Sequence, residues 1–369
     1  MKAIVLEPGT KNLKLADWKE PVIQKDNEVK AKVLRVGICG TDREEASGGR
    51  ADAPNGEKEL IIGHEMIAQV TQVGSKVTKV KPGDHVVMTV RRGCNACPAC
   101  KIFRSDMCLT GNYKERGIKG LHGFHSEFVV DEEDYVVKVP PSIVDIAVLT
   151  EPTTVVEKAI EEAVMIQGAR LPFIKNKETW LQGKTALVAG LGPIGLLASM
   201  VLRLRGANVL GLDIVPKDSP RACLLEAMGG KYLNDKELNP AQFQKDYPDI
   251  ELILDAAGIA KLDFDLRDFL GINGIFVLTG VPGDQRTVNV DGATLMRKLV
   301  LKNQVMVGSV NESIHHFEKA LVDLEAASKK WPGLVQKLIT QRFPHTDFQK
   351  ALTEHTPDEI KVVIEWGNQ

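Results

Sequence analysis

Four cysteines lie close together in this 369-residue chain: Cys94, Cys97, Cys100 and Cys108 follow the spacing C-x2-C-x2-C-x7-C. At this spacing a short loop can wrap four thiolates tetrahedrally around one ion, and four sulfur ligands with no open position are typical of structural zinc. An iron–sulfur cluster is the chemical alternative, but no second cysteine group suggests an electron-transfer chain. We therefore predict one structural Zn²⁺.

A second set of possible metal ligands is spread along the chain. Cys39 lies in VGICGTD, His64 and Glu65 lie in IIGHEM, and Glu151 lies in LTEPTTVVEKA. A thiolate, an imidazole and a carboxylate form a plausible catalytic zinc site, because incomplete protein coordination leaves a position for water or substrate. Cys39 alone would more often be a buried apolar residue, and Glu65 alone a surface charge. Their occurrence together with a nucleotide motif supports the prediction.

That nucleotide motif is ALVAGLGPIG. Gly190, Gly192 and Gly195 form G-x-G-x-x-G between an apolar run and a helical segment, with Pro193 and Ile194 inside the motif. The glycines allow a tight turn, close approach of the backbone to a pyrophosphate, and close packing of helix on strand. We predict that these five residues bind a dinucleotide.

The next apolar run ends in Asp213, which can accept hydrogen bonds from both hydroxyls of an adenosine ribose. Its charge would repel a 2′-phosphate, so NAD is favoured over NADP. Lys217 and Arg221 lie nearby and keep NADP possible, although both can equally be solvated surface cations.

The elements that must position these residues differ along the chain. In the first third, short β-type runs are separated by Gly and Pro, at residues 2–7, 29–38, 66–74, 85–90 and 126–130. Residues 151–167 carry apolar residues at helical spacing. From Thr185 onward, apolar runs alternate with helical segments, which indicates βαβ units in a doubly wound parallel sheet.

We therefore expect an α/β protein in three parts. Residues 1–183 form a mainly β, barrel-like catalytic domain that binds zinc, residues 184–312 form a Rossmann dinucleotide-binding domain, and residues 313–369 return to the catalytic domain. We expect Cys223 to be a packed core thiol, and His315 and His316 to be surface residues at the start of a helix.

Composition narrows the classes of partner. The 47 Lys and Arg residues balance 49 Asp and Glu, for a formal charge of −2, which supplies no field for nucleic acid or anionic lipid. No apolar run approaches the roughly 18 residues that span a bilayer, and MKAIVLE reads as a strand rather than a signal peptide. We expect a cytoplasmic protein with a small-molecule substrate.

The motifs GICGTD, GHE, KPGDHV, the RRGC-x2-C-x2-C-x7-C lobe and GLGPIG, in this order, resemble those of the zinc-dependent medium-chain alcohol dehydrogenases over essentially the whole chain. More narrowly, VRRGCNAC, TGNYKERGI, EP-x4-EKAIEE and GSVNES resemble the glucose 1-dehydrogenase (aldose dehydrogenase) branch. The resemblance implies a GroES-like catalytic domain, a Rossmann domain and a homo-oligomer, commonly a dimer or tetramer. In this family the region of His122 and His125 is a structural turn.

The resemblance also assigns roles to residues. It implies that Cys39 and His64 bind the catalytic zinc, with Glu65 and Glu151 as direct or water-mediated ligands that exchange during turnover. Glu65 and Glu151 would thus lie at the reacting centre, Glu151 beside the substrate.

For the sugar, the resemblance implies that Thr41 touches the reacting hydroxyl and passes its proton outward. It implies that Glu115 binds sugar hydroxyls and that Asn311 lies near both the sugar and the nicotinamide. Some members have Asn and an acid where this chain has Val90 and Val155, so two hydroxyl contacts are open to question.

The implied reaction is oxidation of the C1 hydroxyl of a cyclic aldose, D-glucose foremost, to the lactone, with hydride passing to a nicotinamide. The alternatives are a polyol or secondary-alcohol dehydrogenase with the same zinc and cofactor, and a non-catalytic nucleotide sensor.

Overall fold

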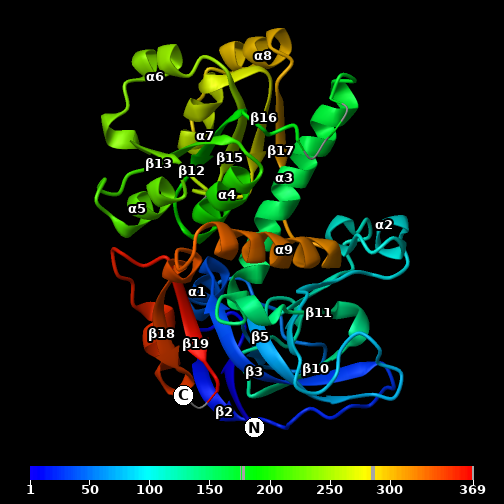
Figure 1. Cartoon of the computed structure of the whole chain (residues 1–369). Coiled ribbons are helices and arrows are strands. Elements are labelled where there is room, and N and C mark those ends of the chain that lie inside the picture. The colour runs from blue at the N-terminus through cyan, green and yellow to red at the C-terminus, as the bar shows by residue number, and fades with distance from the viewer. Residues whose placement is uncertain (175, 177–178, 284–286, 368–369) are drawn as a thin grey trace. The chain divides into compact units, whose positions relative to one another are not determined.

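The computed structural model of the chain describes residues 1–174, 176, 179–283 and 287–367. They form two compact units (Figure 1): Met1–Thr154 with Asn311–Gln369, here called the first unit, and Val155–Val310, the second unit. The boundaries expected at residues 183 and 312 stay a prediction. Among the described residues, no helix is both long enough and apolar enough to cross a bilayer.

The first unit is built mainly from strands in three sheets. The largest sheet contains β3 (Glu28–Ile38), β5 (Glu65–Val73), β6 (His85–Met88), β10 (Phe128–Glu132), β11 (Val136–Lys138), β18 (Ile339–Pro344) and β19 (Lys361–Glu365). Its order is β11-β6-β5-β3-β19-β18, and β10 also pairs with β3. The two smaller sheets contain β1 (Lys2–Leu6), β2 (Leu13–Asp17) and β4 (Leu60–Ile61), and β7 (Arg91–Arg92), β8 (Lys114–Arg116) and β9 (Gly120–Leu121).

Few helices accompany these sheets. They are α1 (Gly40–Ala46), α2 (Pro98–Lys101), α9 (Ile314–Lys330) and α10 (Phe348–Thr353). A long helix, α3 (Thr150–Arg170), runs from the first unit into the second, as the helical spacing predicted. The core is formed by inward-facing apolar residues of β3, β5 and β6 together with residues of α10 and β19. The C-terminal segment therefore completes the core that the N-terminal strands begin.

The second unit is a parallel six-stranded sheet. Its strands are β12 (Thr185–Ala189), β13 (Asn208–Asp213), β14 (Lys231–Asn234), β15 (Ile250–Asp255), β16 (Leu270–Leu278) and β17 (Val305–Gly308). Its helices are α4 (Pro193–Leu204), α5 (Pro220–Ala227), α6 (Pro240–Asp246), α7 (Ala260–Leu266) and α8 (Gly292–Leu301). The order β14-β13-β12-β15-β16-β17 is that of a doubly wound dinucleotide-binding fold. The predicted α/β class is confirmed.

Two expectations about single residues are wrong. Cys223 is exposed, because it lies on the outer side of α5 between the buried Ala222 and Leu224. His316 is fully buried in the first turn of α9, where its Nδ1 accepts a hydrogen bond from the backbone N–H of Ser313 at 3.0 Å. This capping contact turns the ring inward, so His316 is not a surface residue.

The pairing of β3 with β5 leaves no room beside one carboxylate. Gly37 lies directly opposite Glu65 in this antiparallel pair, and a Cβ on Gly37 would overlap Oε2 of Glu65. Gly40, three residues later in α1, has open space around the same position. The register of β3 and β5 therefore depends on the absence of a side chain at Gly37.

We expect Gly37→Ala to lower the free energy of unfolding by about 1–3 kcal/mol, as overpacking of a filled core does. Gly40→Ala is the matched control, and we expect it to change stability by less than about 1 kcal/mol. Urea-induced unfolding of both variants measures this, and equal effects would contradict the packing assignment.

Candidate active site

The four neighbouring cysteines converge on one point. The sulfur atoms of Cys94, Cys97, Cys100 and Cys108 all lie within 4.8 Å of one another, and those of Cys94 and Cys100 are 3.9 Å apart. In a tetrahedral site with Zn–S distances near 2.3 Å, sulfurs are separated by about 3.8 Å, so this set fits zinc. A Cβ on Gly93 would overlap the Cys100 sulfur, which explains why glycine precedes the first ligand.

The pKa values of three of these thiols are shifted, two of them downward and one upward. The hydrogen bond of Thr110 lowers the pKa of Cys94 to about 5, and the same hydroxyl lowers the pKa of Cys108. Burial raises the pKa of Cys100 to about 12. A metal binds thiolates, so Cys100 would lose its proton on binding.

A second potential metal site lies where β3 ends and β5 begins. Sγ of Cys39, a ring nitrogen of His64 and a carboxylate oxygen of Glu65 lie within 4.8 Å of one another. Cys39 caps α1 directly after β3, and Glu65 is the first residue of β5. These are the three predicted ligand types, and they fit an incompletely coordinated zinc ion.

Asp42 orients this set, although the sequence analysis gave it no role. Its Oδ2 accepts a hydrogen bond from the backbone N–H of Cys39 at 2.7 Å, and its Oδ1 lies 3.4 Å from Nδ1 of His64. Because Nδ1 of His64 is directed at this carboxylate, Nε2 is the ring nitrogen that can bind a metal. The sequence feature that could have pointed to Asp42 is its position in GICGTD, three residues after Cys39.

The cluster is electrostatically coupled. Burial would lower the pKa of His64, but the negative charge of Asp42 outweighs it and raises that pKa well above its usual value. Burial would raise the pKa of the Cys39 thiol, but the hydrogen bond and charge of His64 outweigh it and lower that pKa. Each shift therefore favours the charged form of its group, a thiolate at Cys39 and an imidazolium at His64.

Glu65 is neutralised by a lysine that the sequence analysis missed. Nζ of Lys361 donates hydrogen bonds to both carboxylate oxygens of Glu65, at 2.7 and 2.8 Å, and to the carbonyl oxygen of Ile38 at 3.1 Å. Lys361 and Glu65 are almost fully buried. Burial would lower the pKa of Lys361, but the charge of Glu65 outweighs it and raises that pKa. The sequence feature that could have pointed to Lys361 is its place as a charged residue within the apolar run IKVVIEW.

Glu151 approaches the same group from the first turn of α3. As a residue it is only partly buried, yet burial of its carboxyl group raises its pKa well above the usual value, and the charge of Glu312 raises it further. Glu65 and Cys39 contribute in the same direction. Glu151 is thus near the cluster but is not among the three residues whose ligand atoms meet.

A polar triad contains both residues predicted to bind sugar. Nη2 of Arg91 donates a hydrogen bond to Oε1 of Glu115 at 2.9 Å. With the Asn311 amide oriented so that its oxygen faces Arg91, Nδ2 of Asn311 donates to the same Oε1 at 2.7 Å, and its Oδ1 accepts from Nη2 of Arg91. The charge of Glu312, the residue after Asn311, acts on Glu151, so this dipeptide contributes both to the triad and to the electrostatics of the predicted metal ligands.

Thr41 lies in the first turn of α1, two residues after Cys39. Its Oγ1 is 4.0 Å from Sγ of Cys39. The predicted proton carrier is therefore beside the predicted metal ligand.

The glycine motif has the expected geometry in the second unit. Gly190 follows β12 with a φ of +82°, and a Cβ on Gly195 would overlap the carbonyl oxygen of Gly190. Gly192, which caps α4, faces open space, and Pro193 and Ile194 are partly exposed in the first turn. The helix start is thus accessible to a phosphate group.

Asp213, at the end of β13, faces this loop. Its Oδ2 accepts a hydrogen bond from the backbone N–H of Leu191 at 2.7 Å, and its Oδ1 accepts from Ile214 N–H at 2.6 Å. The carboxylate is partly exposed, so it can still accept a ribose hydroxyl.

The two histidines of the family's structural turn lie outside the metal clusters. Nδ1 of His122 accepts from the backbone N–H of Ile61 and its Nε2 faces Glu57 at 2.9 Å. His125 is fully buried, and burial lowers its pKa to about 4. Both arrangements are those of structural histidines.

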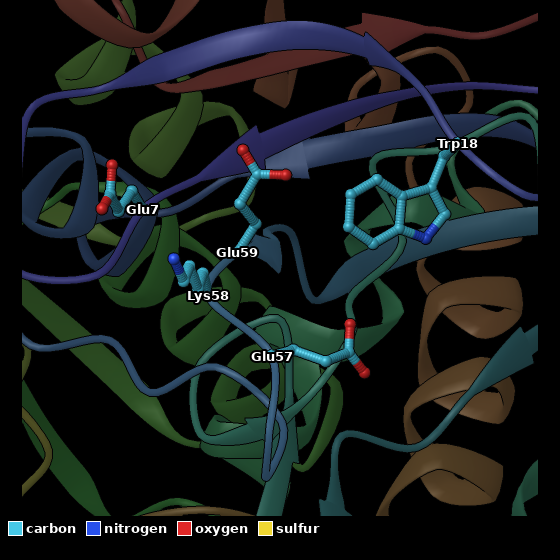
Figure 2. Close-up of a pocket in the computed structure, with 5 residues that line it drawn as sticks. All are labelled: Glu7, Trp18, Glu57, Lys58 and Glu59. Atoms are coloured by element: carbon cyan, nitrogen blue, oxygen red, sulfur yellow. The ribbon is translucent and has the colours of Figure 1, made fainter.

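Figure 2 shows a surface pocket that contains no predicted site residue; it is lined by Glu7, Trp18, Glu57, Lys58 and Glu59. Glu59 is paired with Lys14 at 2.6 Å, and Glu57 with His122. Two of the three carboxylates of this pocket are therefore engaged in surface ion pairs.

We expect about two zinc ions per chain, one at the four cysteines and one at Cys39, His64 and Glu65. The ion at the four cysteines should be retained through purification, because a structural site binds its metal with about 10 kcal/mol or more. Cys94→Ser should lose one ion and lower the melting temperature, and His64→Ala should lose the other ion. Cys223→Ser, which changes an exposed thiol outside both clusters, should keep both ions. Elemental analysis of the purified variants measures this; full zinc content in Cys94→Ser would contradict the assignment.

Comparison with known proteins identifies the family of the chain. Residues 25–141 match the alcohol dehydrogenase GroES-like domain, and residues 144–366 match the glucose dehydrogenase C-terminus. The chain is 40% identical to glucose 1-dehydrogenase 2 of Vulcanisaeta moutnovskia over 366 residues, which is 99% of each chain. It is also 40% identical to glucose 1-dehydrogenase of Thermoproteus tenax, again over 99% of each chain.

Solved structures give the same result. Glucose dehydrogenase of Haloferax mediterranei, in complex with NADP, Zn and gluconolactone, has a TM-score of 0.87 and 31% identity, with 100% of both chains covered. The resemblance that the sequence motifs indicated is confirmed. The chain belongs to the glucose dehydrogenase family within the zinc-dependent alcohol dehydrogenases.

Proposed function

We propose that this chain oxidises the C1 hydroxyl of a cyclic aldose, D-glucose foremost, to the aldonolactone, with a nicotinamide dinucleotide as hydride acceptor. The observation that carries the proposal is the pairing, within one unit, of a thiolate–imidazole–carboxylate cluster with the Arg91–Glu115–Asn311 triad. Full-length relatives are named glucose 1-dehydrogenases, and the Haloferax enzyme binds NADP, Zn and gluconolactone.

Cys39 and His64 would hold a catalytic zinc ion, with Glu65 and Glu151 as direct or water-mediated ligands. Bound zinc would supply Lewis acidity toward the reacting hydroxyl, and the bound nicotinamide would supply the hydride acceptor. Asp42 keeps the His64 ring in place, and Lys361 compensates the charge of Glu65 in the protein interior. Cys94, Cys97, Cys100 and Cys108 would hold the structural zinc.

The remaining residues act on the sugar and its proton. Oxidation at C1 releases the hydroxyl proton, and Thr41, beside Cys39, is placed to accept it and pass it on. Glu115 accepts hydrogen bonds from sugar hydroxyls, and the Asn311 amide can both donate and accept. Together they would orient C1 for hydride transfer.

For the cofactor we propose NAD as the preferred form, with NADP still accepted. Gly190, Gly192 and Gly195 would let the pyrophosphate approach the N-terminus of α4, with Pro193 and Ile194 beside it. The carboxylate of Asp213 favours ribose hydroxyls over a 2′-phosphate. The exposed Lys217 nearby works in the opposite direction.

A polyol or secondary-alcohol dehydrogenase is the second candidate, and the apolar residues Val90 and Val155 favour it. Neither aliphatic side chain can donate a hydrogen bond to a sugar hydroxyl or accept one from it. This candidate keeps the same metal and cofactor and changes only the substrate.

We also propose that the protein is a homo-oligomer, a dimer or tetramer, located in the cytoplasm. β17 is one of the two edge strands of the parallel sheet. Met296, Val300 and Leu301 of the preceding helix α8 are each at least 65% exposed, an apolar surface suited to a second copy.

We expect purified protein to oxidise D-glucose and to lose this activity on treatment with a zinc chelator. Initial rates with D-glucose, D-galactose, D-xylose and sorbitol measure the preference. Faster turnover of sorbitol would favour the polyol candidate, and no turnover of any of these compounds would favour a nucleotide sensor.

We expect Asp213→Asn to shift the ratio of kcat/KM for NAD over NADP toward NADP by about 10- to 100-fold, because the charge that repels a 2′-phosphate is removed. Asp218→Asn, an exposed aspartate five residues away, is the control and should leave the ratio unchanged. An unchanged ratio in Asp213→Asn would contradict the role of Asp213.

Light scattering should give a mass of two or four times that of the 40.5 kDa chain. Leu301→Lys places a charge on the exposed face of α8 and should raise the monomer fraction. A monomeric unmodified protein would contradict the oligomer.

A further inference from the structure

The sequence motifs predicted no function for Arg91, yet it contacts both other members of the triad with Glu115 and Asn311. It belongs to the two-residue strand β7, and Glu115 lies directly opposite it on β8. Arg91 is 7% exposed and Glu115 is 9% exposed, so the pair is shielded from water. A charge-assisted contact between such shielded groups is stronger and better fixed than an exposed ion pair.

The donors around Glu115 all reach one of its two oxygens. Oε1 accepts from Nη2 of Arg91 at 2.9 Å, from Nε of Arg91 at 3.3 Å, and from Nδ2 of Asn311 at 2.7 Å. Among the described residues, no side-chain donor contacts Oε2. The carboxylate is therefore held through Oε1, and Oε2 is the oxygen that remains to accept a hydroxyl.

Arg91 is itself held from two other directions. Its guanidinium carbon lies 3.6 Å from the centre of the Tyr113 ring, and its Nη1 donates to the carbonyl oxygen of Asp106 at 3.5 Å. Asp106 lies between Cys100 and Cys108 in the cysteine loop. The guanidinium therefore contacts both the cysteine loop and Glu115.

The third member of the triad also depends on Arg91. Asn311 has a φ of +61°, a backbone conformation that few residues other than glycine and asparagine adopt readily. Its amide oxygen accepts from Nη2 of Arg91, and its amide nitrogen donates to Glu115. Without Arg91, the Asn311 amide would lose the donor that holds its oxygen in place and so keeps its nitrogen directed at the carboxylate of Glu115.

We propose that Arg91 is the positioning residue for sugar recognition, and that it sets specificity for a hydroxyl-bearing substrate by fixing Glu115 and Asn311. This proposal rests on the proposed aldose oxidation. Arg91 acts through the other two residues: it holds Oε1 of Glu115 so that Oε2 meets one particular hydroxyl, and it sets the amide direction of Asn311.

The test compares Arg91→Met with Lys119→Met as the matched control. Nζ of Lys119 lies 4.2 Å from the centre of the same Tyr113 ring, and Lys119 makes no side-chain contact with Glu115 among the described residues. Both variants therefore lose one cation from this ring. Zinc content, the melting temperature, and kcat and KM are measured for D-glucose and its 2-deoxy and 3-deoxy analogues.

For Arg91→Met we expect unchanged zinc content and a KM for D-glucose raised by about 10- to 100-fold, the range of a lost charge-assisted hydrogen bond, with a smaller change in kcat. We also expect the penalty for the missing hydroxyl, seen with one deoxy analogue in the unmodified enzyme, to shrink. Glu115→Gln combined with Arg91→Met should be little worse than Glu115→Gln alone, because both changes disable the same contact.

Arg91→Lys covers the case in which Arg91→Met does not fold. Its single ammonium group cannot donate from both Nε and Nη2, so we expect an intermediate KM and partial rescue. Full additivity with Glu115→Gln, or a KM and deoxy-sugar penalty equal to those of Lys119→Met, would overturn the role of Arg91. Absence of aldose turnover in the unmodified enzyme would instead overturn the proposed function.

Discussion

The antiparallel pairing of β3 with β5 is the constraint on which the metal site depends. Gly37 faces Glu65 in this pair, Cys39 follows the end of β3, and His64 precedes β5, so one register brings the three ligand types together. β19 pairs with the other side of β3 and brings Lys361 to Glu65. Because an unpaired buried carboxylate is costly, the first strands need the C-terminal strand to form this site.

Arg91 links the cysteine loop with the polar triad of Arg91, Glu115 and Asn311. Arg91 contacts the carbonyl oxygen of Asp106 in the cysteine loop and the carboxylate of Glu115. A structural metal would therefore do more than stabilise its own loop, since it would also fix the surface against which the guanidinium rests. The charge of Glu312, the residue after Asn311, raises the pKa of Glu151, so the triad and the predicted metal ligands are joined by adjacent residues of one segment.

Long apolar runs and motifs with fixed spacing were predictable from the sequence. β12, β13 and β15 are continuous buried runs, and the glycine and cysteine motifs are short enough for local geometry to determine their shape. Contacts between distant short elements were not predictable. β7 and β8 have two and three residues, too few for a periodic pattern, so the sequence did not predict the pairing of Arg91 with Glu115, although the motif TGNYKERGI marked Glu115 itself. Cys223 and His316 were misjudged because a helix face or a capping contact decides burial at a single position.

The central claim is that one unit brings together a zinc site and a sugar site built on Glu115. X-ray diffraction at the zinc absorption edge, from crystals soaked with D-glucono-1,5-lactone, tests it most directly. We expect anomalous density among the four cysteines and between Cys39 and His64, with a lactone hydroxyl on Oε2 of Glu115. Zinc at the cysteine loop alone, or a lactone bound away from Glu115, would contradict the account.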